Sequence, residues 1–453
     1  MPRTDGCIPL IFPKSKPRIL FLNTLHPESP RMTPFALATA LLMLGAAPAP
    51  TKPDSAAWLE FRGPDGVGHY EGPAVPTAWG PDKNVAWKVA IPGAGWSSPI
   101  LLRGKLILTT AVPIGAGEKP DFELRAVCVD AKSGKIDWNE TVFVEKATVS
   151  QPHKKNSHAS PTAVSDGERI IGHFGHMGTA ALDLTGKILW KNEQYPYEHQ
   201  HGNGGSPILA EGNVVFSCDG KDKQMVVALD IKTGKEAWKT DRNMPGLLKF
   251  SFATCQLIEH EGKKQLISAA SNWCAAYDPK SGKEIWRVKY PKPGWSLITR
   301  PVYSHGLVFI SSGYINQHLL AIKPEGTGDI TANIAWMTNK FAPNTPTPLI
   351  VGDELYTISD QATMSCLDAK TGKLHWSSRI KGNAYSSSPI LANGKIYATS
   401  ETGVGLVINP NNQELDVVAE SDMKEKTFAT ILPAHGALYL RTETTLFKFE
   451  TKK

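Results

Sequence analysis

The stretch DIKTGKEAW, Asp230–Trp238, decides the fold, because close copies of it recur along the chain. The other copies are DAKSGKIDW (Asp130–Trp138), DLTGKILW (Asp183–Trp190), DPKSGKEIW (Asp278–Trp286) and DAKTGKLHW (Asp368–Trp376). A variant, IKPEGTGDITANIAW, ends at Trp336, and NVAWKV carries Trp87 without the turn. Successive tryptophans lie 51, 52, 48, 48, 50 and 40 residues apart, so the chain is a repeat with a period of about fifty residues.

Each copy predicts a tight β-hairpin turn. Aspartate starts such a turn through its side chain, glycine takes the position with positive φ, and lysine stays in solvent. Apolar, β-rich segments such as RAVCV and MVVAL come before the turn. The repeat aspartates are therefore explained as turn residues and are poor candidates for catalytic bases: Asp130, Asp183, Asp230, Asp278 and Asp368. We expect the repeat tryptophans to pack between neighbouring units: Trp138, Trp190, Trp238, Trp286, Trp336 and Trp376.

A second strand–turn–strand unit precedes each of these turns. It starts with Ser-Pro or Thr-Pro and a short apolar strand, as in HASPTAVSDGERIIG and SSSPILANGKIYAT. Four strands per period of 40 to 52 residues are typical of a β-propeller blade. No segment has a 3.6-residue apolar period over a helical length. The sequence therefore predicts an all-β protein.

The number of strand sets predicts the number of blades. The sets begin near Trp96, His158, Gly204, Phe252, Thr299, Thr345, Ser386 and Thr427. They predict an eight-bladed propeller, with seven blades as the alternative. The seventh set has Val417 in place of the tryptophan, and the eighth supplies only three strands. We expect the N-terminal strand around Trp87 to complete the eighth blade, because this closes the ring and leaves no open edge.

The chain before the repeats divides into two stretches. Residues 1–50 read as a leader, since the apolar run FALATALLMLGAA (Phe35–Ala47) is too short to span a bilayer and ends in small residues. Translation from Met32 is an alternative start, and a disordered tail with one apolar patch is the alternative to a leader. Residues 51–83 form an N-terminal extension and 84–453 a single propeller. We therefore expect an exported protein, periplasmic or extracellular, without a transmembrane segment in the mature chain.

Charge and cysteines exclude several classes. Of the net charge of +6, the first 50 residues carry +3, from five bases and two acids. The remaining +3 and the absence of a long Lys/Arg run argue against a nucleic-acid partner. After the leader, five cysteines remain without any C-x-x-C pair, which argues against a disulfide framework or a zinc–cysteine site. We expect them to be small buried hydrophobic residues: Cys128, Cys218, Cys255, Cys274 and Cys366.

The A-x-D-x-x-T-G-x-x-x-W pattern resembles the repeat of the pyrroloquinoline quinone (PQQ)-like β-propeller family, which includes quinoprotein alcohol dehydrogenases and the outer-membrane assembly lipoprotein BamB. The resemblance covers about Trp87 to Phe449. The segments WLEFRGPDGVG (Trp58–Gly68), NVAWKV and GAGWSSPI are similar to an exported PQQ-like repeat family. These motifs consist of turn and packing residues, so they indicate the fold more strongly than the function.

For a dehydrogenase, the resemblance implies PQQ with calcium. It also implies an adjacent Cys–Cys pair stacked on the quinone, an opposing tryptophan, and Glu, Asn and Asp ligands for calcium. This chain has no adjacent cysteines. BamB is lipid-anchored, and no cysteine follows the apolar run at an anchor position. We therefore expect no cofactor, with PQQ and calcium as the alternative that the resemblance allows.

One face of the predicted ring gathers the unusual residues. The connections between blades and the second hairpin of each blade lie on this face, which we call the loop face, and the Asp-x-x-Thr-Gly turns lie on the other. Six of the 13 histidines fall between residues 153 and 201. The candidate ligand-binding residues of the loop face are Trp96, Ser97, His158, His176, His201, Asn203, Arg300 and Tyr385.

These candidates allow two interpretations. Imidazoles over the channel could bind a metal or an anion, and we expect His158 and His201 to converge there as metal ligands. Alternatively, the histidines hydrogen-bond strand ends and loops. A charge at Arg300 near the axis would favour an anionic guest. The only carboxylates we consider as ligands or bases are Asp219, Asp360 and Glu401.

Two functions from different classes follow. The first is an exported, non-catalytic propeller, a monomer that binds a protein, peptide or glycan of the cell envelope through its loop face. The second is a divergent PQQ-dependent dehydrogenase that oxidises an alcohol or sugar. The missing cysteine pair favours the first. A metal-dependent lyase or hydrolase in the histidine-rich loops is a third possibility.

Overall fold

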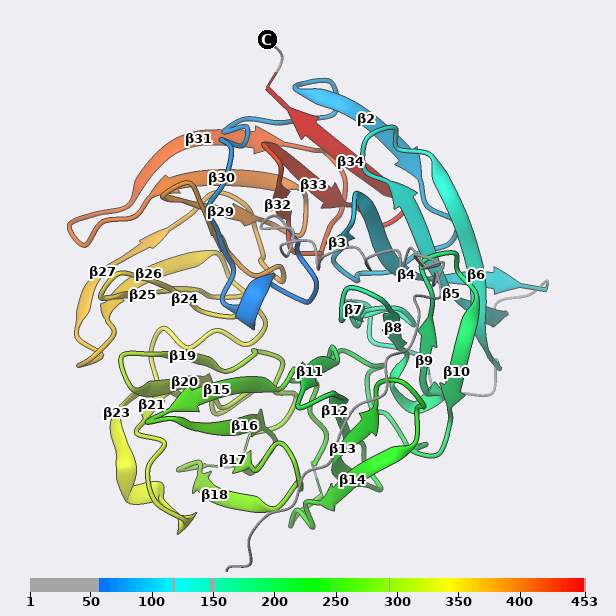
Figure 1. The fold of residues 1–453 in the computed structure, drawn as a ribbon. Coiled ribbons are helices and arrows are strands. Elements are labelled where there is room, and N and C mark those ends of the chain that lie inside the picture. Colours follow the sequence, from blue (N-terminus) through cyan, green and yellow to red (C-terminus); the bar gives the residue numbers. More distant parts are fainter. Residues whose placement is uncertain (1–56, 116–118, 147–150, 248, 293, 452–453) are drawn as a thin grey trace, which may run out of the picture. The chain divides into compact units, whose positions relative to one another are not determined.

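The computed structural model describes residues 57–115, 119–146, 151–247, 249–292 and 294–451. Contacts divide the chain after Thr51, and all described residues belong to the second unit, Lys52–Lys453. The expected leader, residues 1–50, lies outside the described residues. The second unit is a ring of eight β-sheets, the blades of a propeller. Within each sheet the strands lie side by side, one after another from the centre of the ring outward (Figure 1). The prediction of an all-β, eight-bladed propeller is confirmed.

The first four blades are antiparallel meanders in chain order. Blade 1 has β3 (Ile100–Leu102), β4 (Lys105–Ile114), β5 (Asp121–Asp130) and β6 (Ile136–Glu145). Blade 2 has β7 (Val164–Ser165), β8 (Ile170–His173), β9 (Thr179–Leu182) and β10 (Ile188–Asn192). Blade 3 has β11 (Ile208–Ala210), β12 (Asn213–Asp219), β13 (Gln224–Asp230) and β14 (Glu236–Asp241). Blade 4 has β15 (Gln256–His260), β16 (Lys263–Ala269), β17 (Trp273–Tyr277) and β18 (Glu284–Lys289), with β22 (Gly328–Asp329) added in parallel to β18.

The remaining blades complete the ring. Blade 5 has β19 (Val302–Ser304), β20 (Leu307–Ser311), β21 (Leu319–Ile322) and β23 (Ile334–Thr338). Blade 6 has β24 (Leu349–Val351), β25 (Glu354–Ile358), β26 (Thr363–Asp368) and β27 (Leu374–Arg379). Blade 7 has β28 (Ile390–Ala392), β29 (Lys395–Thr399), β30 (Val404–Asn409) and β31 (Asp416–Asp422), with β1 (His69–Tyr70) parallel to β28. Blade 8 has β32 (Leu432–Ala434), β33 (Ala437–Arg441), β34 (Thr445–Glu450) and β2 (Val85–Ala90). The helices of the described residues are three single 3₁₀ turns, η1 (Pro64–Gly66), η2 (Gly175–Met177) and η3 (Thr331–Asn333).

The burial pattern follows the position of each strand in its blade. Strand β13, in the third rank, is almost continuously buried, because other strands and blades cover both of its faces. The outermost strand β2 alternates between half-buried and exposed residues, as expected for a sheet edge with one covered face. None of the described helices is long and apolar enough to cross a membrane.

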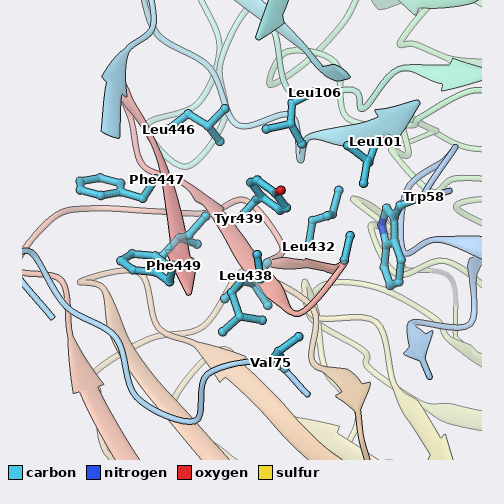
Figure 2. Close-up of a cluster of buried hydrophobic side chains, with 14 of the residues drawn as sticks. Trp58, Val75, Leu101, Leu106, Leu432, Leu438, Tyr439, Leu446, Phe447 and Phe449 are labelled. Carbon is cyan, nitrogen blue, oxygen red and sulfur yellow. The ribbon is translucent and has the colours of Figure 1, made fainter. Parts of the chain in front are cut away.

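The N-terminal strand closes the ring. Strand β2 pairs antiparallel with β34, with Trp87 opposite Lys448 and Val89 opposite Leu446. The first and last strands of the propeller therefore share one sheet, which confirms the predicted closure around Trp87. Figure 2 shows the buried cluster at this junction, where Tyr439 and Leu446 of blade 8 lie near Leu106 of blade 1.

Most repeat tryptophans link one blade to the next. The indole N–H of Trp138 donates to the carbonyl of Leu184, and that of Trp238 donates to Pro279, both in the turn of the following blade. The Trp190 ring covers Gly234, where a Cβ would lie 2.5 Å from the indole. Glycine is thus required at this turn by its φ of 68° and by the ring above it. Trp286 differs, because it donates to Gln265 of its own blade.

The seventh blade corrects one detail of the sequence analysis. Val417 was expected at the tryptophan position, but the strand register places Val417 opposite Ile408 and Ala419 opposite Val407. In blade 6 the corresponding pairs are Leu374 with Leu367 and Trp376 with Cys366. Both outer strands carry the same bulge, but the turn between Ile408 and Val417 is two residues longer than the turn between Leu367 and Leu374, so Ala419 occupies the tryptophan position.

The N-terminal extension runs along the central channel. Trp58 pairs with Leu101 of blade 1, and the amide of Ser165 in blade 2 donates to the Leu59 carbonyl. Further on, β1 joins the innermost strand of blade 7 (Figure 1). The extension therefore contacts inner strands of blades 1, 2 and 7 and lies toward the centre of the ring (Figure 1).

Candidate functional site

Arg300, the expected charge near the axis, is bound by the N-terminal extension. It is 2% exposed and donates to the Phe61 carbonyl (2.7 Å) and the Glu60 carboxylate (3.1 Å). Burial raises the pKa of Glu60 more than the neighbouring Arg300 lowers it. Arg62 lies alongside and donates to the carbonyls of Thr347 and Pro348 in blade 6. Arg300 thus already has a carboxyl partner within the chain, and the guanidinium does not offer the free charge expected for an anionic guest.

Three other predicted residues are structural. Ser97 is fully buried; its hydroxyl donates to the Thr109 carbonyl and accepts a hydrogen bond from Arg441. Tyr385 is also fully buried, and its hydroxyl donates to the Lys381 carbonyl. Trp96 is 8% exposed and packs against Phe428, with ring centroids 4.5 Å apart. These side chains hold the junctions between blades and offer little surface to a ligand.

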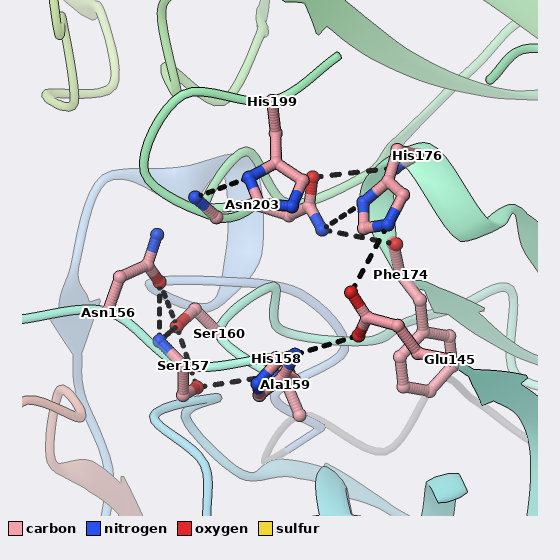
Figure 3. Close-up of polar contacts among 11 residues, drawn as sticks. Glu145, Asn156, Ser157, His158, Ala159, Ser160, Phe174, His176, His199 and Asn203 are labelled. Atoms are coloured by element: carbon pink, nitrogen blue, oxygen red, sulfur yellow. Dashed lines mark hydrogen bonds and ion pairs between the residues drawn. The ribbon is translucent and has the colours of Figure 1, made fainter. Parts of the chain in front are cut away.

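The remaining predicted residues gather around a carboxylate that the sequence analysis missed. Glu145 ends β6, the outer strand of blade 1, and is 2% exposed. His158 lies in the connection from blade 1 to blade 2, and His176 in η2, within the second hairpin of blade 2. His199 and Asn203 lie in the connection from blade 2 to blade 3. Three separate stretches of the loop face therefore meet at Glu145 (Figure 3).

The two carboxylate oxygens of Glu145 face different imidazoles. Oε2 lies 2.8 Å from Nδ1 of His158, and Oε1 lies 3.2 Å from Nε2 of His176. Burial alone would raise the pKa of Glu145, but the neighbouring imidazoles of His158 and His176 lower it to about 2. The carboxylate is therefore ionised at neutral pH and can only accept, so His158 donates from Nδ1.

The loop from blade 2 to blade 3 sets the orientation of two imidazole rings. The side-chain amide of Asn203 lies 3.0 Å from Nδ1 of His176, and the amide of Gly202 donates to Nδ1 of His199 at 2.9 Å. The rings of His176 and His199 are 4.6 Å apart. Burial, followed by the proximity of His176, lowers the pKa of His199 to about 4, so this ring is neutral at neutral pH.

His201 lies in a different group from His158. Its ring contacts His153 at 5.5 Å and Phe250 at 5.4 Å, whereas His158 stacks on Phe122 at 4.0 Å. The ligand atoms that could share one metal ion belong to Glu145, His176 and His199 and lie within 4.8 Å of one another. His158 and His201 thus have different neighbours, and the described residues with metal-ligand spacing are Glu145, His176 and His199. Nothing in the sequence singled out Glu145, because it ends an ordinary strand and has no motif around it.

The carboxylates singled out from the sequence have partners in the chain. Asp219 is buried against Arg242 (3.2 Å) and accepts a hydrogen bond from Ser251. Asp360 accepts the hydroxyl of Thr345, and Glu401 accepts Lys155 and Ser386. These carboxylates hold loops and strand ends in place, which is the structural role that the second interpretation gives to the histidines.

The residues present do not fit PQQ with calcium as the resemblance implies. The five cysteines are separate, unpaired and buried, so no cysteine pair can stack on a quinone. The carboxylates considered as ligands hydrogen-bond protein groups, and the extension fills the channel at Arg300, where a Cβ on Gly66 would lie 2.0 Å from the guanidinium carbon. Each of these features differs from the arrangement that the quinone and its calcium require.

Comparison with known proteins places the fold among relatives. A family model described as outer membrane protein assembly factor BamB matches residues 71–241, 180–342 and 270–417. The BamB of Moranella endobia (strain PCIT) is 26% identical over 244 residues, which is 48% of this chain and 57% of that protein. The quinohemoprotein alcohol dehydrogenase ADH IIB of Pseudomonas putida is 30% identical over 124 residues, 25% of this chain and 17% of that protein.

The chain thus spans about half of the first relative and a sixth of the second. The solved structure of BamB from Moraxella catarrhalis superposes with a TM-score of 0.53 at 12% identity and covers 81% of this chain and 98% of its own, which shows a common fold. Because the three overlapping matches to the family model together extend over most of the propeller, the chain belongs to the PQQ-like repeat family of β-propellers described by BamB.

Proposed function

We propose that the protein is an exported, non-catalytic scaffold that binds a protein partner of the cell envelope through its loop face. The observation that carries this proposal is the exposure of large apolar side chains in the loops of that face. Leu247, between blades 3 and 4, is 93% exposed, and Tyr314 and Ile315, in the second hairpin of blade 5, are 53% and 56% exposed. Exposed apolar groups of this kind favour contact with another macromolecule.

The other large exposed apolar residues have a simpler explanation. Each lies alone on the outermost strand of a different blade, and isolated apolar residues on a surface are common. They are Val144, Leu189, Met337, Leu374 and Val418. The loop-face residues differ because two of them are adjacent in the sequence and project from a hairpin.

The hairpin of Tyr314 is held in place by the neighbouring connection. The Tyr314 amide donates to the Trp295 carbonyl at 2.9 Å, and the two rings lie 6.4 Å apart in an edge-to-face arrangement. Ile315 has a φ of 73°, a conformation that costs a β-branched residue free energy. A presented aromatic side chain beside a strained apolar residue suits a preorganised contact surface.

The family adds support for this class of function. The matching family model is described as an assembly factor for outer membrane proteins, a role that depends on protein contacts. The apolar run Phe35–Ala47 supports export. Cleavage of this run in the native cells, read by N-terminal sequencing of the mature protein, tests the export separately from the binding.

Site-specific photo-crosslinking tests the binding surface. A photoreactive phenylalanine replaces Tyr314 in one variant and Leu189, on an outer strand, in the control. In the native cells we expect a discrete protein adduct from position 314 and none from position 189. Equal adducts from both positions, or adducts from position 189 alone, would contradict the proposed surface.

A further inference from the structure

We propose that Glu145, His176 and His199 bind one divalent transition-metal ion of the zinc class. This site is separate from the apolar hairpin of blade 5 and does not depend on the scaffold function. The donors come from the end of β6, from η2 and from the connection between blades 2 and 3, and all are nearly buried. A metal here would tie the first three blades together at the loop face (Figure 3).

One buried atom points to a missing ligand. The His176 side chain is 9% exposed, and among the described residues its Nε2 has no hydrogen-bond partner with good geometry, although Oε1 of Glu145 lies 3.2 Å away. Buried polar atoms in native proteins nearly always have a partner, and an orphan commonly marks an ion or a water. The orphaned nitrogen of His176 and the carboxylate oxygen of Glu145 face the same point.

The geometry suits a small tetrahedral ion. Zinc binds imidazole nitrogen and carboxylate oxygen at about 2.0–2.1 Å, which places neighbouring ligand atoms of a tetrahedron about 3.3 Å apart. The 3.2 Å between Glu145 Oε1 and His176 Nε2 matches this spacing. The nitrogen of His199 lies within 4.8 Å of both and would have to approach by up to about 1.5 Å to reach this spacing. Calcium and magnesium are disfavoured because they require mainly oxygen ligands.

The surrounding residues orient these donors. His158 donates to Oε2 of Glu145 and so leaves Oε1 directed at His176. Asn203 and Gly202 contact the Nδ1 atoms of His176 and His199 and thereby direct both Nε2 atoms away from the loop backbone. His158 is a second partner of the kind that fixes ligand orientation in metal sites, whereas the Gly202 amide holds the His199 ring in the metal-free protein. His158 is therefore a positioning residue, and His201 has no part in the site.

Binding has a defined proton requirement. In the metal-free protein the Gly202 amide donates to Nδ1 of His199, so the proton of that neutral ring lies on Nε2. A metal at Nε2 moves this proton to Nδ1 and breaks the Gly202 hydrogen bond. For His176, a proton on Nδ1 requires the Asn203 amide to rotate so that its oxygen faces Nδ1–H, and this oxygen then gives up the hydrogen bond from the Tyr197 hydroxyl. Because an imidazole must be neutral to bind a metal, the affinity for the metal should fall when the solution is acid enough to protonate the rings.

Cobalt titration of the untagged full chain tests the site. Co²⁺ is the probe, because its visible ligand-field bands report the geometry of a zinc-class site. We expect one equivalent to give the intense bands of four-coordinate cobalt and Zn²⁺ to abolish them. The variants Glu145→Gln and His199→Gln should weaken Co²⁺ binding at least tenfold, and the control His201→Gln should leave it unchanged.

The outcomes separate the proposal from its alternatives. Absence of cobalt bands at millimolar Co²⁺, or equal binding by wild type and His199→Gln, would overturn it. An equal loss in His201→Gln would instead assign the metal to His153 and His201 and would also overturn it. If Glu145→Gln does not fold, His199→Gln decides, since the contacts of that ring, with the Gly202 amide and the His176 ring, are few and local. Circular dichroism of each variant without metal confirms folding, and a Zn²⁺-dependent rise in the melting temperature of the wild type alone gives a second readout.

Discussion

The Trp79 ring stacks on the Tyr397 ring, with centroids 6.0 Å and planes 23° apart. Trp79 belongs to the N-terminal extension and Tyr397 to the second strand of blade 7, the blade that has Ala419 where the others have tryptophan. In blades 6 and 8 the repeat tryptophan faces the tyrosine of the same rung, Trp376 with Tyr356 and Trp87 with Tyr439. The extension thus supplies from outside the repeat the aromatic ring that the repeat lacks.

Removal of the Trp79 ring tests whether it takes the place of the tryptophan that blade 7 lacks. Trp79 is 2% exposed, so Trp79→Ala should lower the free energy of unfolding by about 3–5 kcal/mol. Denaturant titration followed by circular dichroism measures this loss. Ala419→Trp in the Trp79→Ala background should restore part of the stability, whereas the same change in the wild type should destabilise it, because Trp79 already fills the space. If Ala419→Trp has the same effect in both backgrounds, the two positions do not share one space.

The blades and their ring arrangement could be predicted from the sequence, because short local motifs specify the turns and the tryptophan positions. The Asp-x-x-Thr-Gly spacing fixes each hairpin, and the orphan strand with Trp87 had only one open edge to join. The role of Trp79 could not be predicted, since the missing ring of blade 7 is supplied from a segment more than 300 residues earlier. Its position depends on how the extension folds back over the ring, and no local pattern encodes that path.

The candidate site could be predicted only in part, because topology groups the histidines but long-range contacts decide their partners. Propeller topology placed the histidines on one face, and His158 and His176 do meet there. Their common partner, Glu145, ends a regular strand and carries no motif, so only the tertiary structure reveals it. Arg300 was recognised as unusual, but its partner Glu60 lies in the extension, whose contact with the channel the repeat pattern does not show.

The inter-blade tryptophans give a second prediction. Trp238 is 6% exposed, its N–H donates to the Pro279 carbonyl at 3.1 Å, and its ring covers Gly282. Trp238→Ala should cost about 3–5 kcal/mol of unfolding free energy. Trp238→Phe keeps most of the packing and loses the hydrogen bond, so it should cost much less than the alanine change. Thermal denaturation of both variants checks the order, and a normal melting temperature for Trp238→Ala would count against the link between blades.

The contact between the extension and the channel gives a third prediction. Gly66 has a φ of 65°, and a Cβ there would lie 2.0 Å from the guanidinium carbon of Arg300. Gly104 has a φ of 74° with open space around it and is the matched control. Gly104→Ala should cost about 1 kcal/mol through its backbone alone, and Gly66→Ala clearly more, because the Arg300–Glu60 pair must move. Equal losses of unfolding free energy for the two variants, measured in urea, would show that the extension can move away from Arg300 without further cost.

Acid stability gives a fourth prediction, which depends on His173. This ring is 2% exposed, its Nδ1 lies 2.8 Å from the Thr179 hydroxyl, and burial, with a smaller effect of His176, lowers its pKa to about 3. Because the folded pKa is below the unfolded value of about 6.5, the unfolded chain binds more protons between these values. The contribution of His173 to the free energy of unfolding is therefore fully present above about pH 6.5 and is lost as the pH drops toward 3. His173→Gln should flatten this part of the pH profile of the unfolding free energy, and the exposed control His153→Gln should not. An unchanged slope in His173→Gln would assign the acid sensitivity to other groups.

The final prediction separates scaffold from quinoprotein. Since the cysteines are separate and buried and Asp219, Asp360 and Glu401 are bound within the chain, addition of PQQ and Ca²⁺ to the full chain should leave the quinone absorbance unshifted. No alcohol-dependent dye reduction should follow. The heat-denatured chain is the matched control, because it removes a folded pocket and keeps every functional group. A shift seen with the folded chain alone, accompanied by dye reduction, would contradict the non-catalytic function. Such a result would mean that the channel centre opens and that the contact between Glu60 and Arg300 yields to the quinone.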